Sequence, residues 1–142
     1  MLAESVEGFR SREDTPDTIP SPLSISDAVA ELPRANLAII STPGAYATAE
    51  ALKAIKRGLH VFIFSDNVPV ADEALLKQLA AKKKLLVMGP DCGTAVVGGL
   101  GLGFANTVSP GPVGIVAASG TGCQQLLALL DQERAGESSI KC

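Results

Sequence analysis

The sequence feature that most constrains the fold lies in residues 113–130. There, an apolar run, VGIVAA, stops at SGTG, and the chain then continues as CQQLLALL with helical spacing. This order predicts a strand, a tight turn and a helix. Ser119, Gly120, Thr121 and Gly122 fall where the helix begins, so backbone N–H groups without intrahelical partners point out of the turn. Such a turn can bind a phosphate or carboxylate, which the helix dipole stabilises by about 0.3–1 kcal/mol.

The same four residues also have a purely structural explanation. Serine and threonine are common N-cap residues, and Thr121 followed by Gln124 fits the capping-box pattern. The sequence leaves both interpretations of the turn open, an anion site and a plain helix cap.

Composition restricts the class of protein. The chain has 142 residues, of which 46% are hydrophobic and 19% charged, and this suits one folded domain. No run of about 18 apolar residues indicates a membrane span, and the N-terminus does not have the pattern of a signal peptide, so we expect a cytoplasmic protein. The net charge of −3 offers no basic face for nucleic acid, and three dispersed cysteines with one histidine predict neither a metal site nor a disulfide framework.

Upstream, the order strand, polar turn and helix is repeated. Apolar runs at residues 36–40, 59–64 and 85–88 are typical of buried strands, and helical periodicity follows the first two runs up to residues 57 and 83. This spacing is typical of a parallel sheet with crossover helices, so we predict an α/β fold.

Two segments interrupt this pattern. Residues 1–25 are acidic and contain prolines, which predicts a linker or arm, and Ser26 or Asp27 can then cap a short helix. Residues 89–112 are rich in glycine and proline, which predicts an irregular hairpin around residues 102–105, before the last strand. The glycines between 98 and 103 do not have the spacing of a phosphate-binding loop, so we interpret them as a turn-rich hairpin. We expect a second, smaller unit to begin in this region.

Polar turns should gather along one crevice, because every strand-to-helix turn of a parallel sheet lies at its carboxyl edge. The four turns are Ser41–Gly44, Ser65–Asn67, Gly89–Thr94 and Ser119–Gly122. They would bring hydroxyls, helix N-termini, Asp66, Asp91 and Cys92 together, which predicts a ligand site. Each residue also has a local explanation, the acids as turn formers and Cys92 as a core filler. His60 opens a strand, so we predict a half-exposed strand residue rather than a base.

Four motifs, in the same order, resemble those of a known family. PGAY (43–46), SDNVP (65–69), GPDC (89–92) and VGIVAASGT (113–121) are similar to PAPF, TEGIP, GPNCPG and VGIVSRSGT of the succinyl-CoA synthetase α subunit. The stretches HVFIFSDNVP, LLVMGPDCGTA and GIVAASGTG resemble FdrA, an acyl-CoA synthetase-like protein, more closely still.

The resemblance implies a Rossmann-like or flavodoxin-like parallel sheet that is incomplete. Residues 26–91 would form part of a CoA-binding domain, and residues 92–142 the start of a second, ligase-CoA domain that is truncated. The turns at Pro43 and Ser65–Asp66 would face CoA, and the turns at Asp91–Cys92 and Ser119–Thr121 would face the transferred phosphoryl or acyl group. The catalytic residues stay unknown, with Asp91 and Cys92 as nearby candidates. The ligand-binding residues implied by the motifs are Pro43, Gly44, Ser65, Asp66, Ser119, Gly120, Thr121 and Gly122.

Departures from the family bear on activity. The glycine-rich CoA turn has no counterpart upstream of Asn36, the phosphorylated histidine is absent, and His60 lies in the wrong motif to replace it. Asp91 stands where the synthetases have asparagine, and its charge would repel a phosphate unless the carboxylate is protonated or paired.

We therefore expect a fragment of an FdrA-like acyl-CoA synthetase, or of an oxamate-type carbamoyltransferase, that binds CoA or a phosphate compound. By itself this chain should be inactive, and no metal is inferred. Exposed sheet edges at residues 37–40 or 113–116 predict association with a partner subunit or with further copies. The alternatives are a non-enzymatic CoA- or phosphate-binding module and an inactive truncated product.

Overall fold

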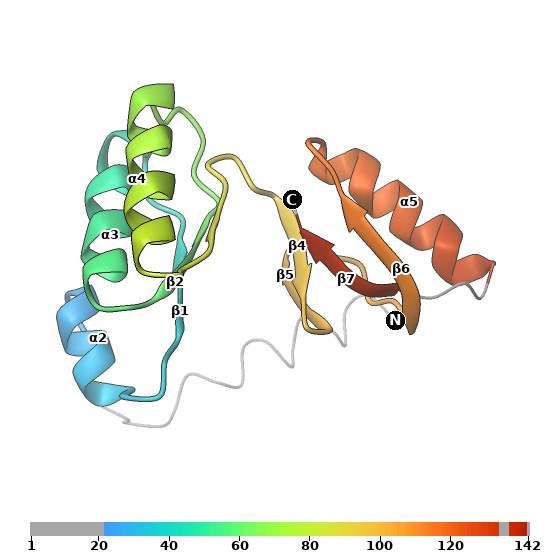
Figure 1. The fold of residues 1–142 in the computed structure, drawn as a ribbon, viewed down its shortest axis with the longest axis horizontal. Helices are drawn as coiled ribbons and strands as arrows, with labels where there is room; N and C mark the ends of the chain where they lie inside the picture. Colours follow the sequence, from blue (N-terminus) through green and yellow to red (C-terminus); the bar gives the residue numbers. More distant parts are fainter. Residues whose placement is uncertain (1–21, 134–136, 142) are drawn as a thin grey trace, which may run out of the picture.

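The computed structural model describes residues 22–133 and 137–141, so most of the predicted arm (1–25) lies outside the described residues. The elements, in chain order, are α2 (Ile25–Glu31), β1 (Leu37–Ile40), α3 (Gly44–Lys56), β2 (His60–Ile63), α4 (Val70–Lys82), β3 (Val87–Met88), β4 (Thr94–Val97), β5 (Leu100–Gly103), β6 (Pro110–Val116), α5 (Gly120–Gln132) and β7 (Glu137–Lys141). Figure 1 shows two halves, with the elements from α2 to β3 in one and those from β4 to β7 in the other.

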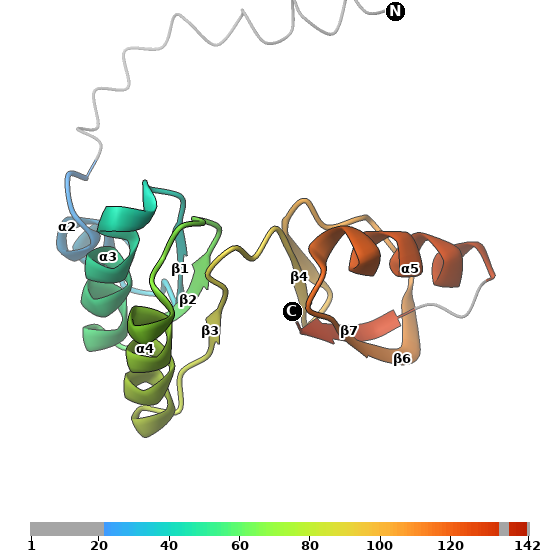
Figure 2. The same ribbon diagram turned by 90° about the horizontal axis from the view of Figure 1, so that it is seen from above.

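The first half confirms the predicted α/β fold. Its sheet has the order β1-β2-β3, and both strand pairs are parallel, with Leu37 opposite His60 and Val61 opposite Val87. Helices α3 and α4 connect successive strands and lie together on one face of the sheet (Figure 2). A core of small and aliphatic side chains joins these two helices to β2. Because β2 is the central strand, it is the most deeply buried of the three.

Alternation along β2 connects the two halves of the molecule. Val61 and Ile63 belong to the core beneath α3 and α4, whereas Phe62 belongs to a second core with Ala95 and Leu102 of the β4–β5 hairpin. Successive side chains of a strand point to opposite faces of its sheet, so the hairpin covers the face that the helices leave open. The long apolar run at 59–64 therefore reflects burial on both faces.

The cap of α2 differs from the prediction. The helix begins after Ser24 rather than after Ser26 or Asp27, because the Ser24 hydroxyl accepts a hydrogen bond from the backbone N–H of Asp27. The same hydroxyl donates to the Asp27 carboxylate at 2.7 Å, so Asp27 is the third helical residue and strengthens the cap.

The glycine-rich segment forms a hairpin, as predicted for the glycines at 98–103, but the hairpin is not centred on residues 102–105. Strands β4 and β5 are antiparallel and pair Val97 with Leu100, so the turn lies at Gly98–Gly99 rather than at residues 102–105. Both of these glycines have positive φ, +59° and +81°, which lets two residues reverse the chain. The segment connects two antiparallel strands and no helix, as expected for a hairpin rather than a phosphate-binding loop.

The prediction that the strand at 113–118 joins the same sheet as the upstream strands is wrong. This strand, β6, begins at Pro110 and pairs in parallel with β7, in a separate sheet. Strand β7 lies in the tail beyond residue 130, where no strand was predicted. Helix α5 packs on β6 and β4 through a third core that contains Ile115, Leu127 and Val96. Among the described residues, no helix has the length and apolar character needed to cross a membrane.

Packing of α4 gives a test of the first core. Leu76 is 0% exposed and its neighbour Leu75 is 44% exposed, so the two residues differ in burial but not in chemistry. We expect Leu76→Ala to lower the free energy of unfolding by about 2–5 kcal/mol, because it leaves a cavity. Leu75→Ala is the matched control and should change stability much less. Equal losses in urea unfolding of the two variants would contradict the packing described for α4.

Candidate functional site

A cavity of about 860 Å³ lies where the two halves meet, and we call it the crevice. All four predicted turns contribute to its wall. The lining residues are Ser41, Thr42, Pro43, Phe64, Ser65, Asp66, Asp91, Gly93, Thr94, Phe104, Ala118, Ser119, Gly120, Thr121 and Gln124. Three turns follow strands of the first sheet, whereas the fourth precedes α5 in the other half. The convergence therefore arises from the meeting of two units and not from a single sheet edge.

Backbone hydrogen bonds hold the turns of the first half together. The N–H of Asp91 donates to the carbonyl of Ser65 at 2.9 Å, and the N–H of Cys92 donates to the carbonyl of Ile63. Asp91 and Asn67 both have φ of +54°, a conformation that aspartate and asparagine tolerate better than most residues. Turn formation thus explains part of the preference for Asp91, while its exposed carboxylate also lines the crevice.

The N-terminus of α5 forms the opposite wall. Ser119 is the N-cap: its hydroxyl accepts from the N–H of Gly122 at 3.2 Å, and its carbonyl accepts from the N–H of Cys123. In an α-helix, the first-turn N–H groups lack intrahelical acceptors. With Gly122 engaged in the cap, the N–H groups of Gly120 and Thr121 are the ones that a ligand in the crevice could reach.

The predicted capping box of Thr121 and Gln124 is wrong. The Gln124 amide donates to the hydroxyl of Thr94 at 2.6 Å, across 30 residues of sequence. Thr94 is fully buried, so this hydrogen bond lies inside the junction and fixes α5 against the start of β4. The Gln124 side chain therefore bonds to Thr94, which is distant in sequence, and does not cap its own helix.

Three of the ten candidate residues lie outside the crevice lining. Gly44 begins α3 so close to the next turn that a Cβ atom would lie 2.3 Å from the carbonyl oxygen of Asp66. Gly122 donates its N–H to the cap. Cys92 is only 5% exposed, belongs to the core around Phe62, and places its Sγ 3.5 Å from the carbonyl oxygen of Thr94. Its burial agrees with the core-filler explanation.

Charge opposes anion binding in part of the crevice. Two carboxylates, Asp66 and Asp91, line it, and among the described lining residues there is no lysine, arginine or histidine. Attraction from the α5 N-terminus therefore competes with repulsion from the acids. In the part of the chain that the structure describes, no group of three or more histidine, cysteine, aspartate or glutamate side chains could hold a metal ion.

Two aromatic residues in the wall were not predicted from the sequence. Phe64 and Phe104 form an edge-to-face pair with ring centroids 5.2 Å apart and an interplanar angle of 70°. Phe64 ends the apolar run of β2, and the adjacent polar turn could have drawn attention to it. Phe104 reaches the crevice only because the hairpin folds back onto Gly93, and no local pattern indicates this.

His60 lies elsewhere, as expected of a strand residue. It is half-buried at the start of β2, and its Nδ1 accepts the N–H of Leu86 at 2.9 Å. The prediction that His60 is structural rather than a base agrees with this position.

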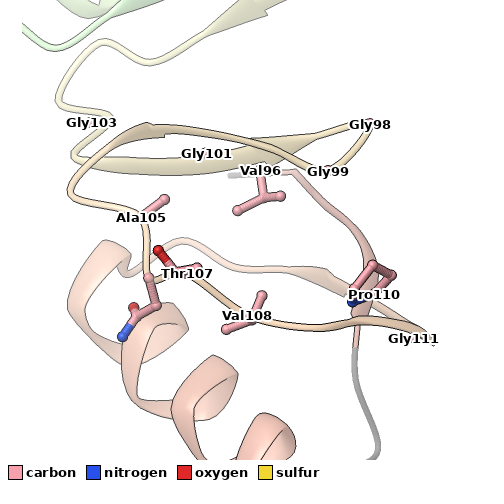
Figure 3. A pocket seen from close by; sticks show the side chains of 11 residues that line it. Val96, Gly98, Gly99, Gly101, Gly103, Ala105, Thr107, Val108, Pro110 and Gly111 are labelled. Atoms are coloured by element: carbon pink, nitrogen blue, oxygen red, sulfur yellow. The ribbon is translucent and has the colours of Figure 1, made fainter.

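A second cavity, of about 560 Å³, lies between the hairpin and the segment that leads to β6 (Figure 3). Val96 and Val108 point into the space between them. Its lining is mainly glycine and apolar residues and contains no charged side chain among the described residues. The crevice has more hydroxyl, carboxylate and helix N-terminal groups, so it is the candidate functional site.

The observed cap gives a stability test. We expect Ser119→Ala to lower the free energy of unfolding by about 0.5–2 kcal/mol, because the N–H of Gly122 loses its acceptor. Thr121→Ala removes a hydroxyl from the same turn without removing the cap, and should have a smaller effect. A larger loss for Thr121→Ala in thermal or urea unfolding would contradict the assignment of Ser119 as N-cap.

Known proteins were found that are similar to this chain in sequence, and others that are similar to it in fold. No model of a known protein family matches the chain. It is 44% identical over 140 residues to the uncharacterized protein YahF of Escherichia coli, which covers 99% of this chain and 27% of that protein. It is 29% identical over 126 residues to the ADP-forming succinate–CoA ligase subunit alpha 1 of Archaeoglobus fulgidus, with 86% of this chain and 43% of that protein covered.

The structure resembles that of ATP citrate lyase from Methanothrix soehngenii, solved in complex with citrate and coenzyme A. The TM-score is 0.75 at 19% identity, covering 84% of this chain and 21% of that one. The chain therefore spans less than half the length of each of these proteins. It is similar in sequence to succinate–CoA ligase α subunits, and it has the Rossmann-like α/β fold found in this ATP citrate lyase.

Proposed function

We propose that this chain binds CoA or another phosphate-bearing ligand in the crevice, as part of an acyl-CoA synthetase-like protein. The observation that carries the proposal is the convergence of four turns with ligase-like motifs on one cavity of about 860 Å³. The sequence similarity to a succinate–CoA ligase α subunit supports it, as does a fold shared with a protein solved with coenzyme A.

Each wall of the crevice has its own role in this proposal. The N-terminus of α5 receives the anionic group through the N–H groups of Gly120 and Thr121. The turns at Pro43 and at Ser65–Asp66 contact the rest of CoA. Asp91 lies beside the group that is transferred in the full enzyme, while Cys92 supports the turn from the core.

The acids explain why we expect weak binding. A phosphate at α5 gains from the helix dipole, but Asp66 and Asp91 line the same cavity without a cation among the described lining residues. The affinity for a doubly charged phosphate should therefore fall below that of an anion site with basic side chains, and it should depend on salt.

The narrower predictions concern the reaction. The motif resemblance favours an FdrA-like synthetase or an oxamate-type carbamoyltransferase, both of which transfer an acyl-type group to or from phosphate. We expect no turnover by the 142-residue chain alone, because its single histidine, His60, is not among the crevice residues. The Nδ1 atom of His60 instead accepts a hydrogen bond from the backbone N–H of Leu86. A non-enzymatic binding module remains the alternative function.

Ligand binding can be tested at Gly120. A Cβ atom there would lie 3.6 Å from Thr94 Oγ1, an ordinary contact, so the backbone can accept a side chain at this position. We expect Gly120→Val to abolish the rise in melting temperature that millimolar CoA or phosphate produces in the wild type, because the branched side chain covers the N–H groups of the turn.

A second variant should act in the opposite direction. Asp91→Asn removes one repelling charge and should tighten phosphate binding roughly two- to fivefold at low salt. A rise in melting temperature that survives in Gly120→Val would refute the anion site at α5. Robust formation of acyl phosphate by this chain alone would refute the expectation of inactivity.

Assembly is a separate part of the proposal. We propose that β1 pairs edge to edge with β1 of a second copy, because β1 is an outer strand of its sheet. Ile39 is 61% exposed on this strand, beside a groove of about 460 Å³ that also contains Leu23. The groove contains Glu50 and Lys53, an ion pair at 2.6 Å, so two copies meet without net repulsion from these side chains.

Light scattering tests this assembly. We expect the wild-type chain to associate at tens of micromolar, roughly the range in which exposed edges pair. Ile39→Lys should yield a monomer, because a charge on an edge strand disfavours pairing, whereas Leu75→Lys on α4 is the matched control and should not. A monomeric wild type, or association with a different polypeptide only, would contradict pairing between copies.

A further inference from the structure

We propose that a pocket at the amino-terminal edge of the first sheet binds a small, neutral, mostly apolar molecule that accepts a hydrogen bond from His60. This amino-edge pocket has a volume of about 310 Å³ and lies between the starts of the first sheet's strands and the β4–β5 hairpin. Among the described residues it shares none with the crevice, so the inference does not depend on the proposed function. The lining residues are Asn36, Leu37, His60, Leu86, Met88, Val97, Leu100 and Leu102.

The apolar wall of the amino-edge pocket continues the core around Phe62. Met88 and Leu102 belong to that core and are only 3% and 7% exposed. Leu37 and Leu86 are half-buried and pack against the same core, whereas the lining as a whole also contains a strongly exposed leucine on the hairpin. The core is therefore open at this end, and an apolar molecule in the pocket would remove this surface from water.

The imidazole of His60 supplies a hydrogen-bond donor to this apolar wall. Its Nδ1 accepts the backbone N–H of Leu86 at 2.9 Å. A neutral imidazole that accepts at Nδ1 carries its proton on Nε2, so Nε2 is a donor. Among the described residues, no group accepts a hydrogen bond from Nε2. A ligand with a carbonyl oxygen can therefore accept from Nε2 without displacing a hydrogen bond within the described part of the protein.

Hydrogen bonds from both neighbouring strands hold His60 in place. The N–H of His60 donates to the carbonyl of Asn36 at 2.8 Å, just before β1. On the other side, the N–H of Val61 donates to the carbonyl of Leu86 at 2.9 Å, and the N–H of Leu86 donates to the imidazole. The ring is thus positioned before a ligand arrives, which reduces the entropy lost on binding.

The lining also restricts the charge and the size of the ligand. Among the described residues that line the pocket there is no lysine, arginine, aspartate or glutamate. An ionised carboxylate or phosphate would lose its hydration without gaining a counter-ion, so a neutral molecule is favoured. A cavity of about 310 Å³ has the volume of about ten water molecules in the liquid, which suits a ligand of roughly ten non-hydrogen atoms.

Strand β2 separates the amino-edge pocket from the crevice. His60 begins the strand, and Phe64, which lines the crevice, directly follows its last residue. The two sites are therefore about 13 Å apart along the strand, at ~3.3 Å per residue. Because they have different lining residues, CoA or phosphate in the crevice should not displace a ligand from the amino-edge pocket.

Three probes that differ in one group test the ligand class. NMR titrations of the 142-residue chain would compare acetophenone, which has a carbonyl acceptor, with ethylbenzene, which lacks it, and with benzoate, which is charged. We expect acetophenone to bind roughly two- to tenfold more tightly than ethylbenzene, the range that one hydrogen bond produces, and benzoate to bind most weakly. Equal affinity for acetophenone and ethylbenzene, or tighter binding of benzoate, would refute the proposed ligand class.

Two substitutions of His60 separate its donor from its acceptor. His60→Asn places a side-chain oxygen near the position of Nδ1, where it can still accept from Leu86, but has no group at the position of Nε2. We expect this variant to bind acetophenone no more tightly than ethylbenzene. His60→Gln places an amide nitrogen near the position of Nε2 and should keep the preference for acetophenone. A preference that survives unchanged in His60→Asn would overturn the role of Nε2.

A change on the hairpin tests the location of the probes. Leu100 is 63% exposed, so the fold should tolerate Leu100→Asp, and the new charge should weaken binding of both acetophenone and ethylbenzene. Leu32→Asp is the matched control, because Leu32 is 66% exposed and does not line the pocket, and it should bind both probes like the wild type. Unchanged binding by Leu100→Asp, or displacement of acetophenone by CoA or phosphate, would place the probe elsewhere and refute the site.

Discussion

The crevice depends on the contact between Phe62 of β2 and the β4–β5 hairpin. Phe62 is fully buried and packs with Leu102 and Met88 on the face of the sheet that α3 and α4 leave open. This contact brings Gly93 and Phe104 beside the strand-to-helix turns of the first half. Without it the polar turns of the first sheet would face solvent, and the N-terminus of α5 would have no opposite wall.

Local patterns predicted the elements of the first half because each element there is determined by nearby residues. Continuous apolar runs indicated β1 and β2, and Gly58, with φ of +81°, directly follows the C-cap of α3, a position where glycine is common. The same argument located the polar turns that line the crevice. It placed the α2 cap two to three residues too late, because Ser24, Ser26 and Asp27 can all cap a helix and only geometry selects among them.

The predictions that failed are those for residues whose partners lie far away in the sequence. Gln124 bonds to Thr94 rather than capping its own helix, and β6 pairs with β7 rather than joining the first sheet. Phe104 enters the crevice through the closure of a glycine hairpin on Gly93. None of these partners is close in sequence, so neither periodicity nor capping rules can detect them.

The short strand β4 belongs to two cores at once. Ala95 faces the core around Phe62, and Val96 faces the core beneath α5. Because neighbouring side chains of a strand face opposite ways, inserting or deleting a single residue in β4 would exchange the two faces and disturb both cores together. Evolution can therefore vary the side chains of this strand, within the space available, far more easily than its length. The Gly98–Gly99 turn, where an added Cβ would meet no atom within 4 Å, is the place where the hairpin can absorb a change in length.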